Sequence, residues 1–237
     1  MIITIHQPEH IPWLGFLNKA SKAELFVILD SVQFEKNYFQ NRNRILGTNG
    51  VQWIGIPVST SGHMEDSIAN TTISTVDGKW RTKYLRTVSM SYGKHPFFDE
   101  VYPLLEECIN IETRYFCDIN LAFIKKLFEK IDIDCEIVRS SDLGVSGLKS
   151  DLILDICKKV KAHTYIAGPS GRDYLQTEDF ARESIKVCYN DFNHPVYPQK
   201  KSKEFVSHLS GIDLFMNVGF LEGKRILTEG NEGLSDE

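Results

Sequence analysis

The stretch that decides the fold is MIITIHQPEHIPWLGFLNKASKAELFVILD, residues 1–30. Ile2–Ile5 is a short apolar run of strand length, and Pro8 ends it because proline removes a backbone donor. Residues 14–23 have helical character, and residues 24–29 form a second compact apolar run. The order strand, loop, helix, strand favours a right-handed βαβ unit of a parallel sheet.

The rest of the chain continues this alternation of apolar strands and amphipathic helices. Strands are expected over 51–58, 135–138 and 164–167, and helices over 77–91, 97–109, 115–131 and 151–160. Ser150 is expected to cap the last of these helices. The pattern predicts an α/β fold with a Rossmann-like parallel sheet core flanked by helices, and a helical insertion. We expect one domain over residues 1–228 and a disordered acidic tail over 229–237.

Composition places the chain among ordinary globular proteins. Of its 237 residues, 42% are hydrophobic and 25% are charged, which argues against a disordered or fibrous chain. The net charge of −5 argues against DNA as a partner, because a surface that follows phosphates makes a whole domain basic. No apolar run approaches the roughly 20 residues that span a bilayer, and no export signal is visible, so we expect a cytoplasmic protein without membrane insertion.

Several chemistries lack support in the sequence. The five cysteines are an odd set without a C-x-x-C pair, and most lie in apolar runs, so we expect reduced, buried thiols. No H-E-x-x-H motif or Cys/His quartet appears, and no metal is expected. The motifs of P-loop enzymes, serine esterases and standard dinucleotide folds are also absent. No covalently bound cofactor is predicted.

The first candidate site follows the first strand. His6, Gln7, Trp13 and Lys19 gather at the carboxyl end of that strand and the opening of the next helix. Amides at such a helix start and a nearby lysine can hold a phosphate, and a histidine can act as general acid or base near neutral pH. Asp30, just past the second strand, is another candidate base. The structural alternative is that His6 only ends the strand and Trp13 belongs to the core.

The second candidate site is the polar segment between residues 30 and 44. Its side chains suit a ligand with phosphate and hydroxyl groups, because arginine binds phosphate in a bidentate manner and asparagine both donates and accepts. The residues concerned are Gln33, Lys36, Asn41, Arg42, Asn43 and Arg44. A sugar nucleotide is such a ligand. The alternative is a turn whose charges face water.

Two later loops and one helix add further candidates. The glycines Gly168 and Gly171 flank Ser170 after a predicted strand and would allow a ligand close to the backbone, with Tyr174 following. His194 and Tyr197 are placed to line a pocket in a proline-rich loop, and Arg81 lies beside a basic stripe of the helix over 77–91. The structural alternatives are a turn, a rigid loop and an exposed helix face.

Many of these residues form a pattern that resembles a known family. The pattern starts with His6-Gln7-Pro8-x-x-x-Pro12-Trp13-x-Gly15-Phe16-x-x-Lys19, Phe26-Val27-x-Leu29-Asp30-x-Val32-Gln33-Phe34-x-Lys36 and Asn41-Arg42-Asn43-x-Ile45. It continues with Lys79-Trp80-Arg81, Tyr165-x-x-Gly168-Pro169-Ser170-Gly171-x-x-Tyr174 and His194-Pro195-x-Tyr197-Pro198-Gln199. This pattern is similar to the signature of the WbqC-like family of bacterial polysaccharide-locus proteins and covers nearly the whole chain.

The resemblance implies a role in the biosynthesis of surface polysaccharide, such as the O-antigen of lipopolysaccharide. It implies a transferase that attaches an acyl or aminoacyl group, for example glycyl, to the amine of an amino-sugar nucleotide. In this hypothesis the basic residues of both candidate sites hold phosphates, and His6 or Asp30 accepts the amine proton. Lys19 is a third candidate for the catalytic base. The choice among His6, Asp30 and Lys19, the acyl donor, the sugar and the oligomeric state stay open.

Two alternative functions also stay open. One is a non-catalytic protein of the same pathway that binds a nucleotide or sugar nucleotide. The other is an ATP-dependent amide-forming ligase, since the first 30 residues resemble, more weakly, the start of nucleotidylyl transferases and pantothenate synthetase. Those enzymes carry H-x-G-H where this chain has Trp13-Leu14-Gly15-Phe16, and the absence of both histidines argues against adenylyl transfer.

Overall fold

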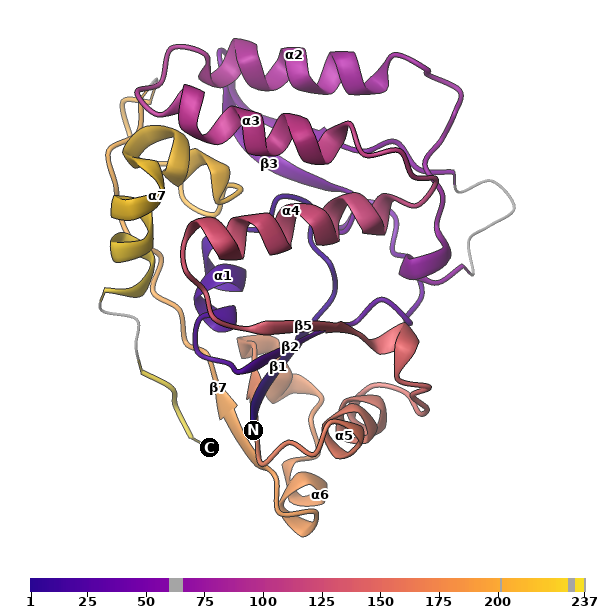
Figure 1. Cartoon of the computed structure of the whole chain (residues 1–237). Coiled ribbons are helices and arrows are strands. Elements are labelled where there is room, and N and C mark those ends of the chain that lie inside the picture. Colours follow the sequence, from indigo (N-terminus) through magenta and orange to yellow (C-terminus); the bar gives the residue numbers. More distant parts are fainter. Residues whose placement is uncertain (60–65, 201, 230–232, 237) are drawn as a thin grey trace.

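A five-stranded parallel sheet with the order β5-β2-β1-β6-β7 forms the centre of the computed structural model, which describes residues 1–59, 66–200, 202–229 and 233–236 (Figure 1). Its strands are β1 (Ile2–His6), β2 (Leu25–Ile28), β5 (Glu136–Arg139), β6 (Thr164–Ala167) and β7 (Lys186–Tyr189). The α-helices are α1 (Leu14–Ala20), α2 (Trp80–Tyr92), α3 (Phe98–Ile109), α4 (Phe116–Lys130), α5 (Ser150–Lys159), α6 (Thr177–Arg182) and α7 (Ile212–Thr228). The predicted α/β class with a Rossmann-like core is confirmed.

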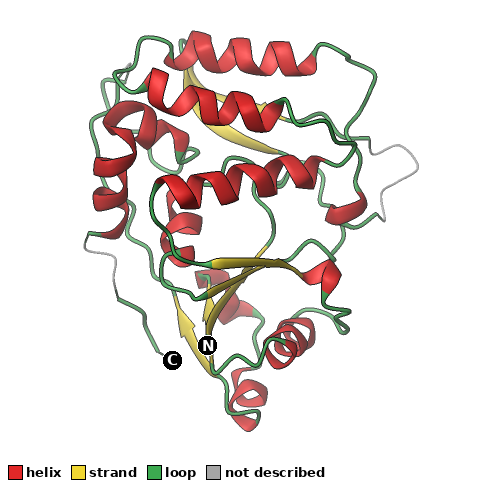
Figure 2. Ribbon diagram, viewed as in Figure 1, coloured by secondary structure: helices red, strands yellow, loops and turns green. Residues whose placement is uncertain are grey.

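Alternate side chains of β2 pack against different helices on the two faces of the sheet. Phe26 and Ile28 belong to a core shared with α1, α4 and α7. Leu25 and Val27 belong to a second core, shared with α5 and α6 on the other face (Figure 2). Successive side chains of a strand point to opposite faces, so a wholly apolar strand fits a sheet that is covered on both sides.

An insertion between β2 and β5 carries a hairpin and the helices α2, α3 and α4. The hairpin strands, β3 (Arg42–Gly47) and β4 (Gly50–Gly55), pair antiparallel and apart from the main sheet. The expected strand over 51–58 is therefore β4 and ends earlier. β3 is missing from the prediction because its first residues, Arg42 to Arg44, show no apolar period.

Two predicted helix starts also differ from the structure. The helix expected from residue 77 begins at Trp80. Ser150 is the first residue of α5 rather than its cap, and its Oγ accepts a hydrogen bond from the backbone N–H of Gln176 at 2.9 Å. Three 3-10 helices complete the described elements: η1 (Ile68–Asn70), η2 (Ser140–Asp142) and η3 (Pro169–Asp173).

The strand order reverses next to β1. The chain runs from β1 to β2 on one side, whereas β6 pairs with the other side of β1. In open parallel sheets, ligands bind outside the carboxyl ends of the strands at such a switch point. His6 ends β1 and Gly168 follows β6, so both lie at this edge of the sheet.

Part of the expected disordered tail lies against the edge strand β7. The backbones of Ser235 and Tyr189 exchange hydrogen bonds of 2.9 and 3.1 Å, and Asp236 pairs with Lys186 at 2.8 Å. Residues 230–232 and 237 lie outside the described part of the chain. Among the described residues, no helix combines the length and apolar character needed to cross a membrane.

Candidate functional site

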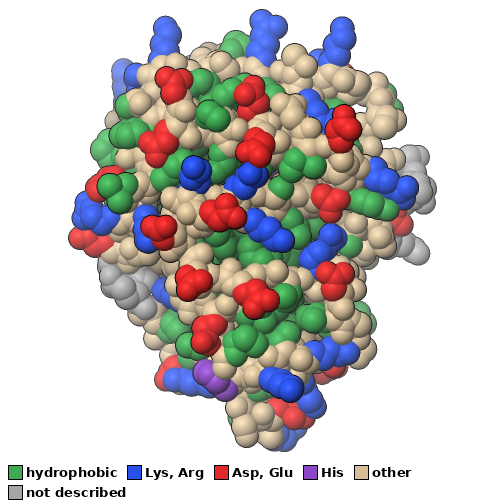
Figure 3. All heavy atoms as spheres, viewed as in Figure 1, with side chains coloured by type: hydrophobic (Ala, Val, Ile, Leu, Met, Phe, Trp, Pro, Cys, Tyr) green, Lys and Arg blue, Asp and Glu red, His purple; other side chains and the backbone are tan. Residues whose placement is uncertain are grey.

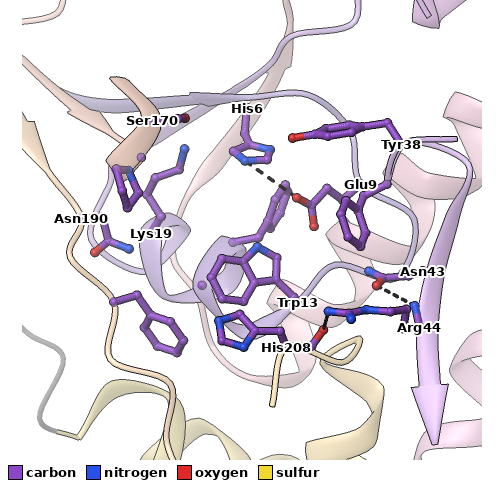
Figure 4. A pocket seen from close by; sticks show the side chains of 16 residues that line it. His6, Glu9, Trp13, Lys19, Tyr38, Asn43, Arg44, Ser170, Asn190 and His208 are labelled. Carbon is purple, nitrogen blue, oxygen red and sulfur yellow. Dashed lines mark hydrogen bonds and ion pairs between the residues drawn. The ribbon is translucent and has the colours of Figure 1, made fainter. Parts of the chain in front are cut away.

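A pocket of about 420 Å³ opens at the carboxyl edge of the sheet, at the switch point between β1 and β6 (Figure 4). Its volume is in the range of small-molecule sites. The pocket is lined by several predicted site residues, namely His6, Trp13, Lys19, Asn43, Arg44, Gly168 and Ser170. The structure thus brings the first candidate site, the end of the second one and the loop after β6 into one place.

His6 presents one ring nitrogen to the pocket. Its Nδ1 donates to the carbonyl of Gln7 at 3.0 Å, so the lone pair of the neutral ring is on Nε2. Nε2 lies 3.8 Å from Oε1 of Glu9. Burial, aided by the charge of Lys19, lowers the pKa of His6 to about 3, so the ring is neutral at pH 7.

Lys19 is buried in α1 under the pocket. Its Nζ donates to the carbonyl of Ile5 at 3.1 Å. Burial lowers the pKa of Lys19 to about 7, against the opposing charge of Glu9. The ammonium group is therefore close to losing its proton at neutral pH, and it can serve either as a cation or as a proton carrier.

Glu9 also lines the pocket, although the sequence did not indicate it as a site residue. Its carboxyl group is buried. Its side chain is 9% exposed. Burial raises its pKa to about 7, although the backbone N–H of Trp13 and the charge of Lys19 act in the opposite direction. Oε2 is buried and has no hydrogen-bond partner. The only sequence signal was its place three residues after His6.

Aromatic rings form another wall of the pocket. The ring of Trp13 stacks on His208 with centroids 5.4 Å apart and meets the edge of Phe192 at 5.6 Å. Gly15 makes this position possible, because a Cβ atom there would lie 2.3 Å from two ring carbons of Trp13. His208 comes from a loop nearly 200 residues away, and no local pattern singled it out.

Arg44 and Asn43 enter the wall from β3. Arg44 Nη2 donates to the carbonyl of His208 at 2.9 Å, and its Nε is buried without a partner. Asn43 Nδ2 donates to the carbonyls of His10 and Ile11, both at 3.1 Å. Arg44 therefore keeps a donor for a ligand, whereas the amide of Asn43 holds the loop after β1 in place.

The loops after β6 and β7 close the opposite side. Gly168 comes directly after β6, Ser170 lies at the start of η3, and Asn190 comes directly after β7. Lys22 donates to Oδ1 of Asn190 at 2.6 Å, which leaves the amide nitrogen of Asn190 on the pocket side (Figure 4). Ser170 and Asn190 add uncharged hydrogen-bonding groups beside Lys19.

Asp30 lies outside the pocket lining, contrary to the role of base considered for it. The side chain is fully buried and accepts from Arg139 Nε at 2.5 Å. Ser140 Oγ, and both the backbone N–H and the Oγ of Ser141, also donate to the carboxylate. These contacts occupy both oxygens and join β2 to β5, so the structure gives Asp30 a structural role.

Arg81 is also outside the pocket. Its Nε and Nη2 donate to the carbonyls of Ile109 and Ile111 at 2.8 and 3.1 Å, which satisfies the end of α3. The neighbouring stripe of Lys79, Lys83 and Arg86 is exposed. Figure 3 shows basic side chains projecting along the α2 edge, with acidic and basic groups interspersed below them.

Tyr197 and His194 support the pocket without lining it. The Tyr197 hydroxyl donates to buried Asp213 at 2.9 Å, as does the hydroxyl of Tyr92. His194 Nε2 accepts a hydrogen bond from the backbone N–H of His208 at 3.1 Å. His194 thus holds the loop that presents His208.

Most of the remaining predicted residues have structural partners. Gln7 accepts from Gln40, Asn41 donates to the carbonyl of Ile56, and Tyr174 bonds with Tyr165. A Cβ on Gly171 would lie 2.9 Å from Leu175 and 3.0 Å from Ala167, so this glycine serves packing. Gln33 and Lys36 are exposed and do not line the pocket.

An aromatic surface extends from the pocket to the hairpin. Tyr38 and Phe39 line the pocket, and Phe39 contacts Trp53 of β4 with centroids 5.6 Å apart. Trp53 is 47% exposed, and the guanidinium of Arg42 lies 4.2 Å from its ring centroid. We call Tyr38, Phe39, Trp53 and Arg42 the aromatic platform.

The described residues contain no cluster suited to metal binding, and their cysteines are not arranged for catalysis. Within the described ranges, no three His, Cys, Asp or Glu side chains are placed to hold a metal ion. All five cysteines are free, and Cys135 is the one that is not fully buried. Burial raises the pKa of Cys157 to about 12, so this thiol is not activated for nucleophilic attack.

A family profile and one sequence relative match most of the chain. The profile of the WbqC-like protein family matches residues 7–224. Uncharacterized protein Rv1507c of Mycobacterium tuberculosis (strain ATCC 25618 / H37Rv) is 27% identical over 219 residues, which cover 92% of this chain and 94% of that protein. The profile match covers the residues that line the pocket except His6, which directly precedes it.

Proposed function

The chain belongs to the WbqC-like protein family, and from this membership and the pocket we propose a transferase that attaches an acyl or aminoacyl group to the amine of an amino-sugar nucleotide. The observation that carries the proposal is the meeting of His6, Glu9 and Lys19 in one pocket at the switch point of the sheet. The setting we propose is surface-polysaccharide biosynthesis in the cytoplasm, where free thiols persist.

The distribution of donors supports a phosphorylated substrate. Lys19, Ser170 and Asn190 lie together on one side of the pocket, and Arg44 with its unpartnered Nε lies on the other wall (Figure 4). Such donors suit phosphate oxygens, which accept several hydrogen bonds at once. The carboxyl of Glu9 lies between them, so a ligand with both phosphate and amino groups matches the pocket better than a phosphate alone.

The aromatic platform supports a nucleotide rather than a simple sugar phosphate. A flat base stacks well on exposed aromatic rings and on guanidinium groups. Tyr38 and Phe39 belong to both the pocket and the platform, so a nucleotide whose sugar lies in the pocket could place its base against Trp53.

The chemistry requires a base and an activated acyl donor. The amine nitrogen uses its lone pair to form a bond to the acyl carbon, and the leaving group departs with the electron pair of the broken bond. The amine must give up a proton for this attack. Neutral Nε2 of His6 and the carboxylate of Glu9, both facing the pocket, are the groups available to guide and accept it.

The experiment that tests the proposal is turnover combined with binding. The purified protein is incubated with UDP-glucosamine, which has a free amine, and with coenzyme A thioesters, aminoacyl-tRNA, or free acids plus ATP, and the amide product is sought by mass spectrometry. Arg44→Ala and Ser170→Ala should weaken the thermal stabilisation by the nucleotide. Arg86→Ala, an exposed change on α2, is the matched control and should have no effect.

Other outcomes select the alternatives. Amide formation only with ATP, accompanied by release of AMP or ADP, identifies a ligase. Stabilisation by sugar nucleotides without any product across the donor panel identifies a binding protein. Product formation that is indifferent to Arg44→Ala and Ser170→Ala contradicts the placement of the site.

A further inference from the structure

The carboxylate of Glu9 has one oxygen that lacks a hydrogen-bond donor in the free protein. Glu9 lines the pocket, its side chain is more than nine-tenths buried, and its buried Oε2 has no hydrogen-bond partner. A buried carboxylate oxygen normally has a donor, because leaving it unpaired costs free energy. The unsatisfied oxygen therefore marks the place where a donor of the substrate binds.

The groups around Glu9, including the backbone N–H of Trp13 that lowers its pKa, leave Oε2 without a hydrogen-bond donor. Nε2 of His6, from β1, is 3.8 Å from Oε1, too far for a hydrogen bond. Lys19, from α1, acts on Glu9 through its charge, but its Nζ donates to Ile5. Burial raises the pKa of Tyr38, and the negative charge of Glu9 raises it further. Arg44, from β3, lines the same pocket and donates to His208.

An amine fits this position better than a hydroxyl group. An ammonium group has several N–H donors and a positive charge, so it can satisfy Glu9 Oε2 and also donate to the lone pair of His6 Nε2. Charge-assisted bonds to a carboxylate are about twice as strong as neutral ones. A hydroxyl group offers one proton and no charge, so it would add no positive charge to that of Lys19 beside the buried carboxylate.

Building on the proposed function, we propose that Glu9 binds the substrate's amino group as an ammonium ion and is the general base that removes its proton. The N–H bond breaks, its electron pair stays on nitrogen, and the proton passes to Oε2 of Glu9. The neutral amine then forms the bond to the acyl carbon of an activated acyl donor. The bond to the leaving group breaks with its electron pair, and the second amine proton leaves with that group.

His6 then has a positioning role. Its Nδ1 is fixed by the carbonyl of Gln7, so the imidazole holds its Nε2 lone pair toward the amine. Glu9 has a pKa near 7, which suits proton transfer at neutral pH, whereas the buried imidazole of His6 is too weak a base.

The first test compares an amine with its hydroxyl counterpart. Calorimetric titration measures the affinity of the wild-type protein and of Glu9→Gln for UDP-glucosamine and UDP-glucose. We expect the wild type to prefer the amine by at least tenfold, and Glu9→Gln to lose that preference while retaining its affinity for UDP-glucose. Glu35→Gln, the same change on an exposed carboxylate outside the pocket, should keep the preference.

The second test separates the base from the transferase proposal. Where a product forms, Glu9→Gln should lower kcat by about 100-fold or more, as expected for loss of a general base. An unchanged kcat would contradict the role of Glu9 and leave the transferase intact. A Glu9-dependent amine preference without turnover on any donor would retain the amine site and overturn the transferase. Equal affinity for the two nucleotides, or binding of neither, overturns the inference.

Discussion

The ring of Trp13 occupies the space that a side chain on Gly15 would need, since a Cβ atom there would lie 2.3 Å from two ring carbons. This contact sets the wall of the pocket on which His208 stacks. A glycine in a helix is usually less favourable than alanine by about 1 kcal/mol, so its presence in α1 has a steric reason.

Gly15→Ala should therefore damage the pocket despite its better helix propensity. We expect the displaced Trp13 ring to lower the free energy of unfolding by about 1–3 kcal/mol, as overpacking does, and to weaken nucleotide binding at least tenfold. Gly78→Ala is the control, because a Cβ at Gly78 meets no atom within 4 Å. Chemical denaturation and titration calorimetry measure both quantities, and a more stable Gly15→Ala with normal affinity contradicts the contact.

Trp53→Ala should affect nucleotides selectively. If the base lies on the aromatic platform, the loss of stacking should weaken binding of UDP-glucosamine by about 1–3 kcal/mol and leave binding of glucosamine 1-phosphate unchanged. Trp53 is 47% exposed, so the fold should tolerate the change. Val76→Ala, at a position that is 96% exposed, is the control. Equal losses for the two ligands would place the base elsewhere.

Asp30→Asn distinguishes a structural carboxylate from a catalytic one. Removing one partner of a buried, hydrogen-bonded ion pair costs about 3–5 kcal/mol. Asp30 is fully buried between Arg139 and the serines of η2, but Arg139 is partly exposed and also pairs with Asp118, so we expect the lower end of this range. We expect a large loss in the free energy of unfolding, measured in urea. The kcat of the folded fraction should depend on pH as it does in the wild type. A change on the acidic side of this pH profile would instead identify Asp30 as the catalytic base.

The sequence predicts the part of the site that depends on single elements. His6 and Lys19 are found because a residue that ends a parallel strand, or lies in the following helix, is placed by the βαβ unit itself. Asp30 occupies the equivalent position after β2, but Arg139 and Ser140, about 110 residues later, occupy its carboxylate. His6 and Asp30 share the same local pattern at a strand end, and only the contacts from the neighbouring strand β5 distinguish Asp30.

The missed residues depend on contacts that no local pattern encodes. Glu9 turns into the pocket because the chain folds back at Ile11, which has a positive φ of 39°, and because Asn43 holds the carbonyls of His10 and Ile11. His208 reaches Trp13 from another end of the chain through its backbone bond to His194. Neither residue can be predicted without the hairpin β3–β4, because Asn43 and Arg44 of β3 hold the two loops concerned. The polar start of β3 kept this strand out of the prediction.

Glu9→Gln should change how stability depends on pH. The pKa of Glu9 is raised in the folded protein from 4.5 to about 7, so the unfolded chain loses this proton first as pH rises. The stabilisation from holding the proton is complete below pH 4.5 and is lost as pH rises through 7. At pH 8 the wild type contains a buried charge without a hydrogen-bond donor on Oε2, and glutamine does not.

The variant should therefore match the wild type near pH 4.5 and exceed its free energy of unfolding at pH 8 by up to about 3 kcal/mol, since each pKa unit corresponds to about 1.4 kcal/mol. Lys19 tempers this gain, because Glu9 raises the pKa of Lys19 and the variant removes that attraction. Urea denaturation of both proteins at pH 5, 6, 7 and 8 measures the difference, with Glu35→Gln as control. The contrary result is a free energy of unfolding of Glu9→Gln that falls below that of the wild type as pH rises from 5 to 8. It would show that Glu9 has a partner in the free protein and that the amine site is already filled.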